Sequence, residues 1–77
     1  MAMYLNELKP GQSVRIASMG TLEGPVRRRL MAMGLLPHSE VRFLRQAPLG
    51  DPIQISTGSI TLSIQKQLAM QIEVVAL

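Results

Sequence analysis

The sequence predicts an all-β fold with little helix, a small barrel of five short strands. Three features support it: short runs alternate apolar and polar residues, turn residues separate these runs, and helical spacing occurs in only one longer stretch. The expected strands are residues 12–19, 40–47, 53–56, 59–64 and 71–76. One short helix follows the first strand and one helical turn precedes the last. Short strands of this number are expected to close into a small barrel, which leaves few open edges.

The predicted helix follows the first strand. Pro10-Gly11 has the residues of a type II turn and leads into that strand. Pro25 suits the first turn of a helix, an apolar stripe follows at helical spacing, and Gly34 ends the run. The stripe consists of Val26, Leu30 and Met33. A helix of about nine residues persists only when it packs on something. Residues 27–29 are all arginine, lie off the centre of the stripe and are expected to face water or a partner.

The central reversal of the chain is Ala47–Ile55, which contains two prolines and a glycine. Gly50 can adopt positive φ, and Pro52 can begin a strand but not occupy its middle. The next two strands are expected to form a hairpin with Thr57-Gly58 as its loop. That register pairs Ile55 with Ile60 and Ile53 with Leu62, so that these four side chains share the inner face.

Length and composition indicate one domain, residues 1–77, with 47% hydrophobic residues. The absence of cysteine excludes disulfides and thiolate metal sites. No stretch of eighteen residues lacks a charge, so no transmembrane helix is expected, and no apolar run resembles a signal peptide. The net charge of +3 is modest for a nucleic-acid-binding protein.

The sequence gives no support for catalysis, and we expect a protein that is not an enzyme. The five acidic residues show no paired spacing, and no glycine-rich phosphate loop is present. His38 is the only histidine and, with Glu40 and Asp51, the one weak candidate for a metal ligand. The alternative is that all three are ordinary turn and strand residues. The six methionines are interpreted as core filling.

The densest charge in the chain is Arg27–Arg29, which indicates either a solvated helix face or a docking surface. Tyr4 and Phe43 are the only aromatic residues, so bases would find no stacking platform. Among the functional interpretations, docking to a protein is therefore favoured over binding to nucleic acid. Self-association is left open, because Val75 and Leu77 are expected on the outer face of the last strand.

An ordered set of motifs spans almost the whole chain and resembles the FeoA family. It includes residues 5–11 (LNELKPG), 27–30 (RRRL), 33–37 (MGLLP) and 45–53 (RQAPLGDPI). It continues with Gly58, Leu62, Ala69 and residues 72–74 (IEV). The chain departs from the family at His38, where glycine is common, and at Gln65, where arginine is frequent. We expect the turn at His38 to differ in conformation.

The resemblance implies an SH3-like barrel and an accessory role in bacterial Fe(II) uptake. It further implies a cytoplasmic protein, at the inner face of the membrane, that binds and modulates FeoB, a transporter with a GTP-binding domain. No cofactor is expected, and Fe(II) is the ion of the pathway. The candidate partner surface comprises Arg27, Arg28, Met31, Leu49, Gly50 and Asp51. The alternatives are a metal-binding sensor or carrier and a basic barrel that binds nucleic acid.

Overall fold

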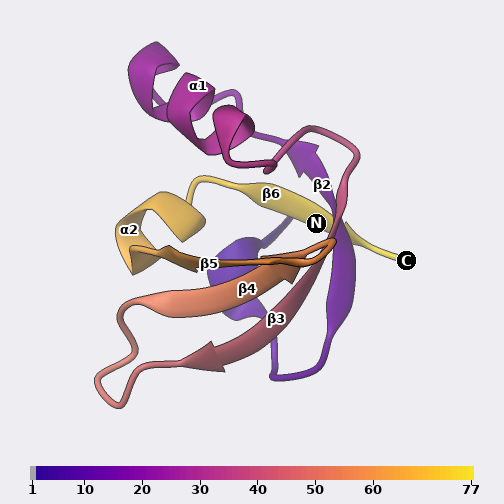
Figure 1. Ribbon diagram of the computed structural model, residues 1–77, viewed down its shortest axis with the longest axis vertical. Helices are drawn as coiled ribbons and strands as arrows, with labels where there is room; N and C mark the ends of the chain where they lie inside the picture. The colour runs from indigo at the N-terminus through magenta and orange to yellow at the C-terminus, as the bar shows by residue number, and fades with distance from the viewer. Residues whose placement is uncertain (1) are drawn as a thin grey trace.

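A computed structural model describes residues 2–77 and shows a strongly bent antiparallel sheet with two short helices (Figure 1). The order of strands in the sheet is β1-β6-β2-β3-β4-β5. The elements are β1 (Met3–Tyr4), the 3-10 helix η1 (Leu5–Glu7), β2 (Ser13–Ser18), α1 (Gly24–Ala32), β3 (Glu40–Gln46), β4 (Ile53–Thr57), β5 (Ile60–Ile64), α2 (Lys66–Ala69) and β6 (Glu73–Ala76). The predicted fold class is confirmed: a mainly β, barrel-like sheet, with one helix after the first long strand and a helical turn before the last.

The structure adds one strand to the five expected from the sequence. This strand, β1, has two residues, which pair with Glu73 and Val74 of β6. The backbone N–H of Tyr4 donates to Glu7 Oε1 at 2.7 Å, and the N–H of Leu5 donates to the carbonyl of Ile72 at 3.0 Å. The first bond closes the 3-10 turn, and the second ties the start of the chain to the residue that precedes β6. A two-residue strand is too short for alternation to reveal it.

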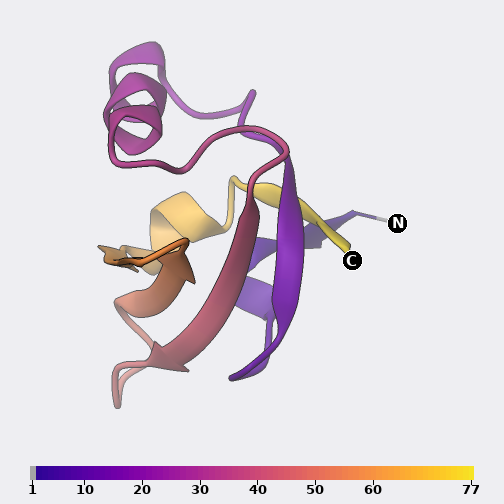
Figure 2. The same ribbon diagram turned by 45° about the vertical axis from the view of Figure 1, so that its right-hand side comes forward.

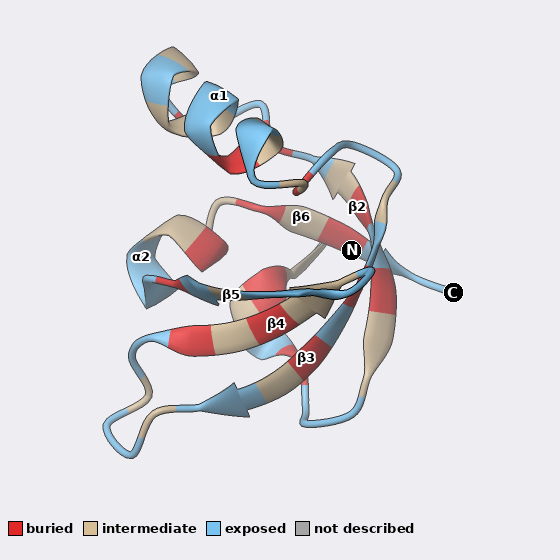
Figure 3. Ribbon diagram, viewed as in Figure 1, coloured by how far each residue is buried: buried red, intermediate tan, exposed pale blue. Residues whose placement is uncertain are grey.

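The concave side of the sheet forms one apolar core (Figure 3). Buried residues alternate with exposed ones along β2 and β3, as the period of two requires. Its largest fully buried side chains are Phe43, Leu5, Ile16, Leu35, Ile53, Ile55, Ile64, Ile72, Val14, Val41 and Val74. No polar or charged residue in the described part of the chain is buried. The barrel is therefore held together by apolar burial.

The β4–β5 hairpin has a different register from the predicted one. Its loop is Gly58-Ser59, so Thr57 pairs with Ile60 and Ile55 pairs with Leu62. Gly58 has φ +61°, which suits a glycine at the first loop position of a two-residue hairpin. A shift of two residues leaves the same side chains on the inner face but moves them along the barrel. Leu62 is half-buried and Ile60 is 50% exposed, so the expectation that Ile60 enters the core is wrong.

Helix α1 ends as predicted. Gly34 has φ +103°, its N–H donates to the carbonyl of Met31, and the N–H of Leu35 donates to the carbonyl of Leu30. This is a Schellman motif, and it brings two buried leucines, Leu30 and Leu35, together below the helix. Met33, expected in the apolar stripe, is instead 38% exposed.

Two turns of the same type precede β2 and β3. Pro10-Gly11 forms the expected type II turn, with Gly11 at φ +88° and the N–H of Gln12 bonded to the carbonyl of Lys9. Pro37-His38 repeats this arrangement, with His38 at φ +69° and the N–H of Ser39 bonded to the carbonyl of Leu36. His38 thus adopts the left-handed conformation that glycine takes at little cost.

Candidate functional site

Helix α1 presents the basic surface expected from the sequence, but its three arginines differ in exposure. Arg28 and Arg29 are exposed. Arg27 is half-buried, and its Nη1 donates to the carbonyl of Leu22 at 3.2 Å. Met31 is also half-buried and packs against the core. On α1, the charge that is free to meet a partner is therefore that of Arg28 and Arg29. The sequence predicts that all three arginines face water or a partner, but the candidate partner surface includes only Arg27 and Arg28.

The β3–β4 loop holds the other half of the predicted surface. Leu49 at its tip is 96% exposed. The loop is closed by two backbone bonds, from the N–H of Ala47 to the carbonyl of Pro52 and from the N–H of Gly50 to the carbonyl of Ala47. Asp51 Oδ1 accepts a hydrogen bond at 2.9 Å from the N–H of Lys66, at the start of α2. Asp51 thus fastens the loop to α2, a contact that nothing in the sequence indicated.

The two halves of the predicted surface lie at opposite ends of the molecule. In both Figure 1 and Figure 2, α1 lies at the top and the β3–β4 loop at the bottom. The structure therefore does not bring Arg28 and Leu49 into one compact patch. A partner would have to be large to contact both.

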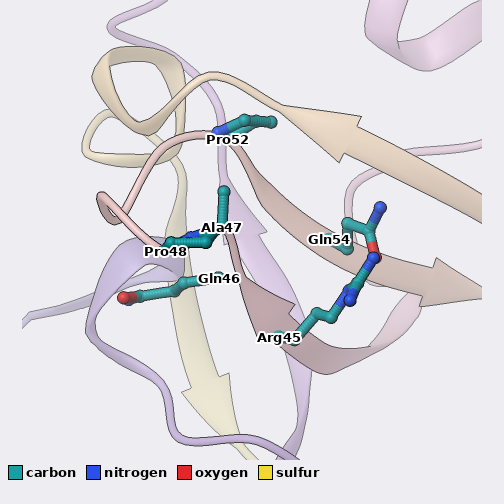
Figure 4. Close-up of a pocket in the computed structure, with 6 residues that line it drawn as sticks. All are labelled: Arg45, Gln46, Ala47, Pro48, Pro52 and Gln54. Carbon is teal, nitrogen blue, oxygen red and sulfur yellow. The ribbon is translucent and has the colours of Figure 1, made fainter.

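A small pocket lies beside the β3–β4 loop (Figure 4). It has a volume of about 120 Å³ and is lined by Arg45, Gln46, Ala47, Pro48, Pro52 and Gln54. Arg45 Nε donates to Gln54 Oε1 at 2.7 Å. The lining offers one cation and two amides, without the nucleophile and base that covalent catalysis needs.

A groove that the sequence interpretation missed runs between α1 and the end of the sheet. We call it the α1–β5 groove; it is lined by Arg29, Leu30, Met33, Ser63, Ile64, Gln65 and Leu68. Met33 lies on its helix side and Ser63 on its strand side. A methionine four residues after Arg29 was the available signal, but the predicted stripe had assigned Met33 to the core.

The structure does not gather the candidate metal ligands. His38 is exposed in the turn before β3, whereas Asp51 lies in the β3–β4 loop and binds the backbone of α2. Residues 2–77 contain no group of three or more histidine, cysteine, aspartate or glutamate side chains that could hold a metal ion. Nor does this part of the chain form a helix long and apolar enough to cross a bilayer.

Comparison with known proteins agrees with this architecture. The family described as the FeoA domain matches residues 3–76. The FeoA protein of Chlorobium tepidum is 40% identical with a TM-score of 0.91, and the match covers 97% of this chain and 70% of that one. A FeoA-like protein of Clostridium acetobutylicum is 33% identical with a TM-score of 0.85, covering 99% of this chain and 87% of that one.

A third relative connects the family to its fold description. FeoA of Stenotrophomonas maltophilia, solved with zinc and described as a prokaryotic SH3 domain protein, is 28% identical with a TM-score of 0.80. The match covers 95% of this chain and 89% of that one. Family match, identity and fold agree over nearly the whole length, and the chain belongs to the FeoA family of accessory proteins of ferrous iron transport.

Proposed function

We propose that this protein is a non-enzymatic cytoplasmic accessory that binds and modulates FeoB, the GTP-binding membrane transporter of ferrous iron. The contact is made at the inner face of the membrane through the exposed basic surface of α1. The observation that carries this proposal is the exposed pair Arg28 and Arg29 on α1. The barrel that presents them belongs to the FeoA family, and its described part has no buried polar or charged residue.

The chemistry of this surface suits an acidic partner surface. Neighbouring cations at the rim of an interface mainly accelerate association and make affinity dependent on salt. Exposed apolar groups lie nearby at the C-terminal end of α1 and beyond it, at Met33 and Leu36. Apolar area next to arginine is typical of protein interfaces, in which methionine and arginine are enriched.

Charge reversal tests the proposal. The double variant Arg28→Glu/Arg29→Glu is compared with Arg42→Glu, which reverses an exposed arginine on β3 opposite Ser13 and Ser56. We expect the double variant to weaken binding to the purified full-length transporter at least tenfold and to reduce iron uptake in cells, while Arg42→Glu leaves both within twofold. Equal losses in both variants would indicate a general effect of net charge, and no loss in either would refute the proposed surface.

The β3–β4 loop is tested separately because it lies at the other end of the molecule. Leu49→Ser removes an apolar side chain that is 96% exposed, so the fold should be unaffected. A loss of transporter binding in this variant, with unchanged thermal stability, would show that the partner spans both ends. Unchanged binding would restrict the interface to the α1 end.

A further inference from the structure

Strand β5 is an open edge of the sheet. It is the last strand in the order β1-β6-β2-β3-β4-β5 and, among residues 2–77, pairs only with β4. The two-residue loop makes Thr57 and Ile60 the first hydrogen-bonded pair of the hairpin. Hydrogen-bonded pairs alternate with open ones in an antiparallel ladder, so the backbone groups of Thr61 and Ser63 point away from β4. These N–H and C=O groups form a ready template for another strand.

The two edges of the sheet differ in their protection. The edge strand β1 has two residues, a length that leaves almost nothing to pair with. In contrast, β5 has five residues, ITLSI, with no charge, proline or glycine, and its pairing with β4 shows no bulge. Short length, charge, proline and a bulge, four devices by which proteins block edge pairing, are therefore missing from β5.

A groove already lies beside this edge. The α1–β5 groove has Ser63 and Ile64 on one side and Arg29 and Met33 on the other. Adjacent strands lie about 4.8 Å apart, so a strand added to β5 would run along the groove and meet the side chains of α1. Arg29 is the charged residue of the lining, and the rest is apolar or neutral.

We infer that the α1–β5 groove binds an extended acidic segment of a partner protein, which adds to the sheet as a strand next to β5. The main-chain bonds come from Thr61 and Ser63, and a carboxylate of the segment pairs with Arg29. The apolar side chains that alternate with the carboxylates point to the opposite face of the added strand and pack against Leu68. This inference rests on the proposed function only for the identity of the partner, the transporter.

Charge favours such a partner over a second copy of the chain. A second copy would bring to the groove its own β5, whose sequence ITLSI has no carboxylate to pair with Arg29. An acidic segment supplies that carboxylate.

The test uses the full chain and a synthetic hexapeptide that alternates aspartate and valine, with a lysine–valine hexapeptide as its control. We expect the acidic peptide to shift the NMR signals of Thr61 and Ser63 and to protect their amides from hydrogen exchange. Arg29→Glu should lower the affinity at least tenfold. Ser63→Pro should abolish binding but leave the fold intact, because the N–H that it removes points away from β4. Should that variant not fold, Ser63→Lys places a blocking charge at the same position.

Three outcomes would overturn the inference: no shift at millimolar peptide, equal binding of both peptides, or full binding by Ser63→Pro. If the free protein self-associates and Ser63→Pro abolishes this association, the occupant of the groove is a second copy. That result would also overturn the inference. Binding of the purified transporter separates the two proposals. Transporter binding that Ser63→Pro leaves unchanged refutes this inference alone, whereas peptide binding without transporter binding refutes the proposed function alone.

Discussion

Replacing His38 with glycine should stabilise the protein. His38 occupies the third position of a type II turn at φ +69°, and its side chain is exposed. A non-glycine residue in the left-handed region costs roughly 1–2 kcal/mol. Glycine also raises the conformational entropy of the unfolded chain, which lowers the free energy of unfolding by roughly 0.4–1 kcal/mol. The difference predicts that His38→Gly raises the free energy of unfolding by about 0.5–1 kcal/mol, or Tm by about 2–8 °C in a domain of this size.

The other type II turn supplies the matched experiment with the opposite sign. Gly11 sits at φ +88°, and a Cβ built there would meet only Arg42 Nη2, at 4.0 Å. Gly11→Ala is therefore free of steric contact and should lower the free energy of unfolding by about 0.5–1 kcal/mol through its backbone alone. His38→Ala keeps the left-handed backbone and should change stability by less than about 0.5 kcal/mol.

Thermal and urea unfolding of these three variants, monitored by circular dichroism, tests whether the positive φ at His38 lowers stability. A Tm for His38→Gly at or below that of the parent protein would refute the reasoning. An equal gain in His38→Ala would show that the imidazole side chain, rather than the backbone conformation, is the source of the effect.

Three further predictions concern stability, each measured by urea unfolding. Asp51→Ala should lower the free energy of unfolding by about 1 kcal/mol, because it removes the acceptor for the N–H of Lys66, and Asp51→Asn should recover most of the loss; equal losses would exclude that hydrogen bond as the cause. Ile64→Ala, at a position 2% exposed, should cost about 2–5 kcal/mol, and Ile60→Ala, 50% exposed, less than about 1 kcal/mol; the reverse order would contradict the observed register. Gly34→Ala should cost about 1 kcal/mol because φ there is +103°, and a neutral result would show that the Schellman turn is not maintained.

The fold could be predicted largely because its local signals are unambiguous. Pro25 and Gly34 bracket the helix, and Pro10-Gly11 marks the turn that leads into β2. Proline fixes its own φ and glycine permits positive φ, so their effects do not depend on distant contacts. The same reasoning extends to His38 only in part. The Pro37-His38 pair indicates a turn, but a histidine does not by itself indicate positive φ.

The hairpin register could not be predicted because alternation cannot distinguish shifts of two residues. Thr57-Gly58 and Gly58-Ser59 are both reasonable two-residue loops, and either puts Ile60 and Leu62 on the inner face. The difference lies in which isoleucine reaches the centre of the core. Ile64 does so in the structure, while Ile60 remains at the rim near the loop.

The candidate site was only partly predictable for a related reason. The sequence identifies α1 and the β3–β4 loop as exposed, yet their separation depends on how the sheet bends, which no local pattern encodes. The α1–β5 groove depends on the same bend, since it joins residues of α1 to residues more than thirty positions later in the chain.

The position of the basic surface follows from the core rather than from the helix itself. An isolated helix of nine residues is unstable in water, so α1 depends on what it packs against. Leu30 within it and Leu35 just beyond it are both buried, and the Schellman bonds connect them. The direction in which Arg28 and Arg29 project, and the width of the groove beside β5, are consequently set by two buried leucines, of which Leu30 also lines the groove. Substitutions at these leucines would disturb stability and binding together, whereas charge reversal at the exposed arginines and proline at Ser63 change the interface while the core stays intact.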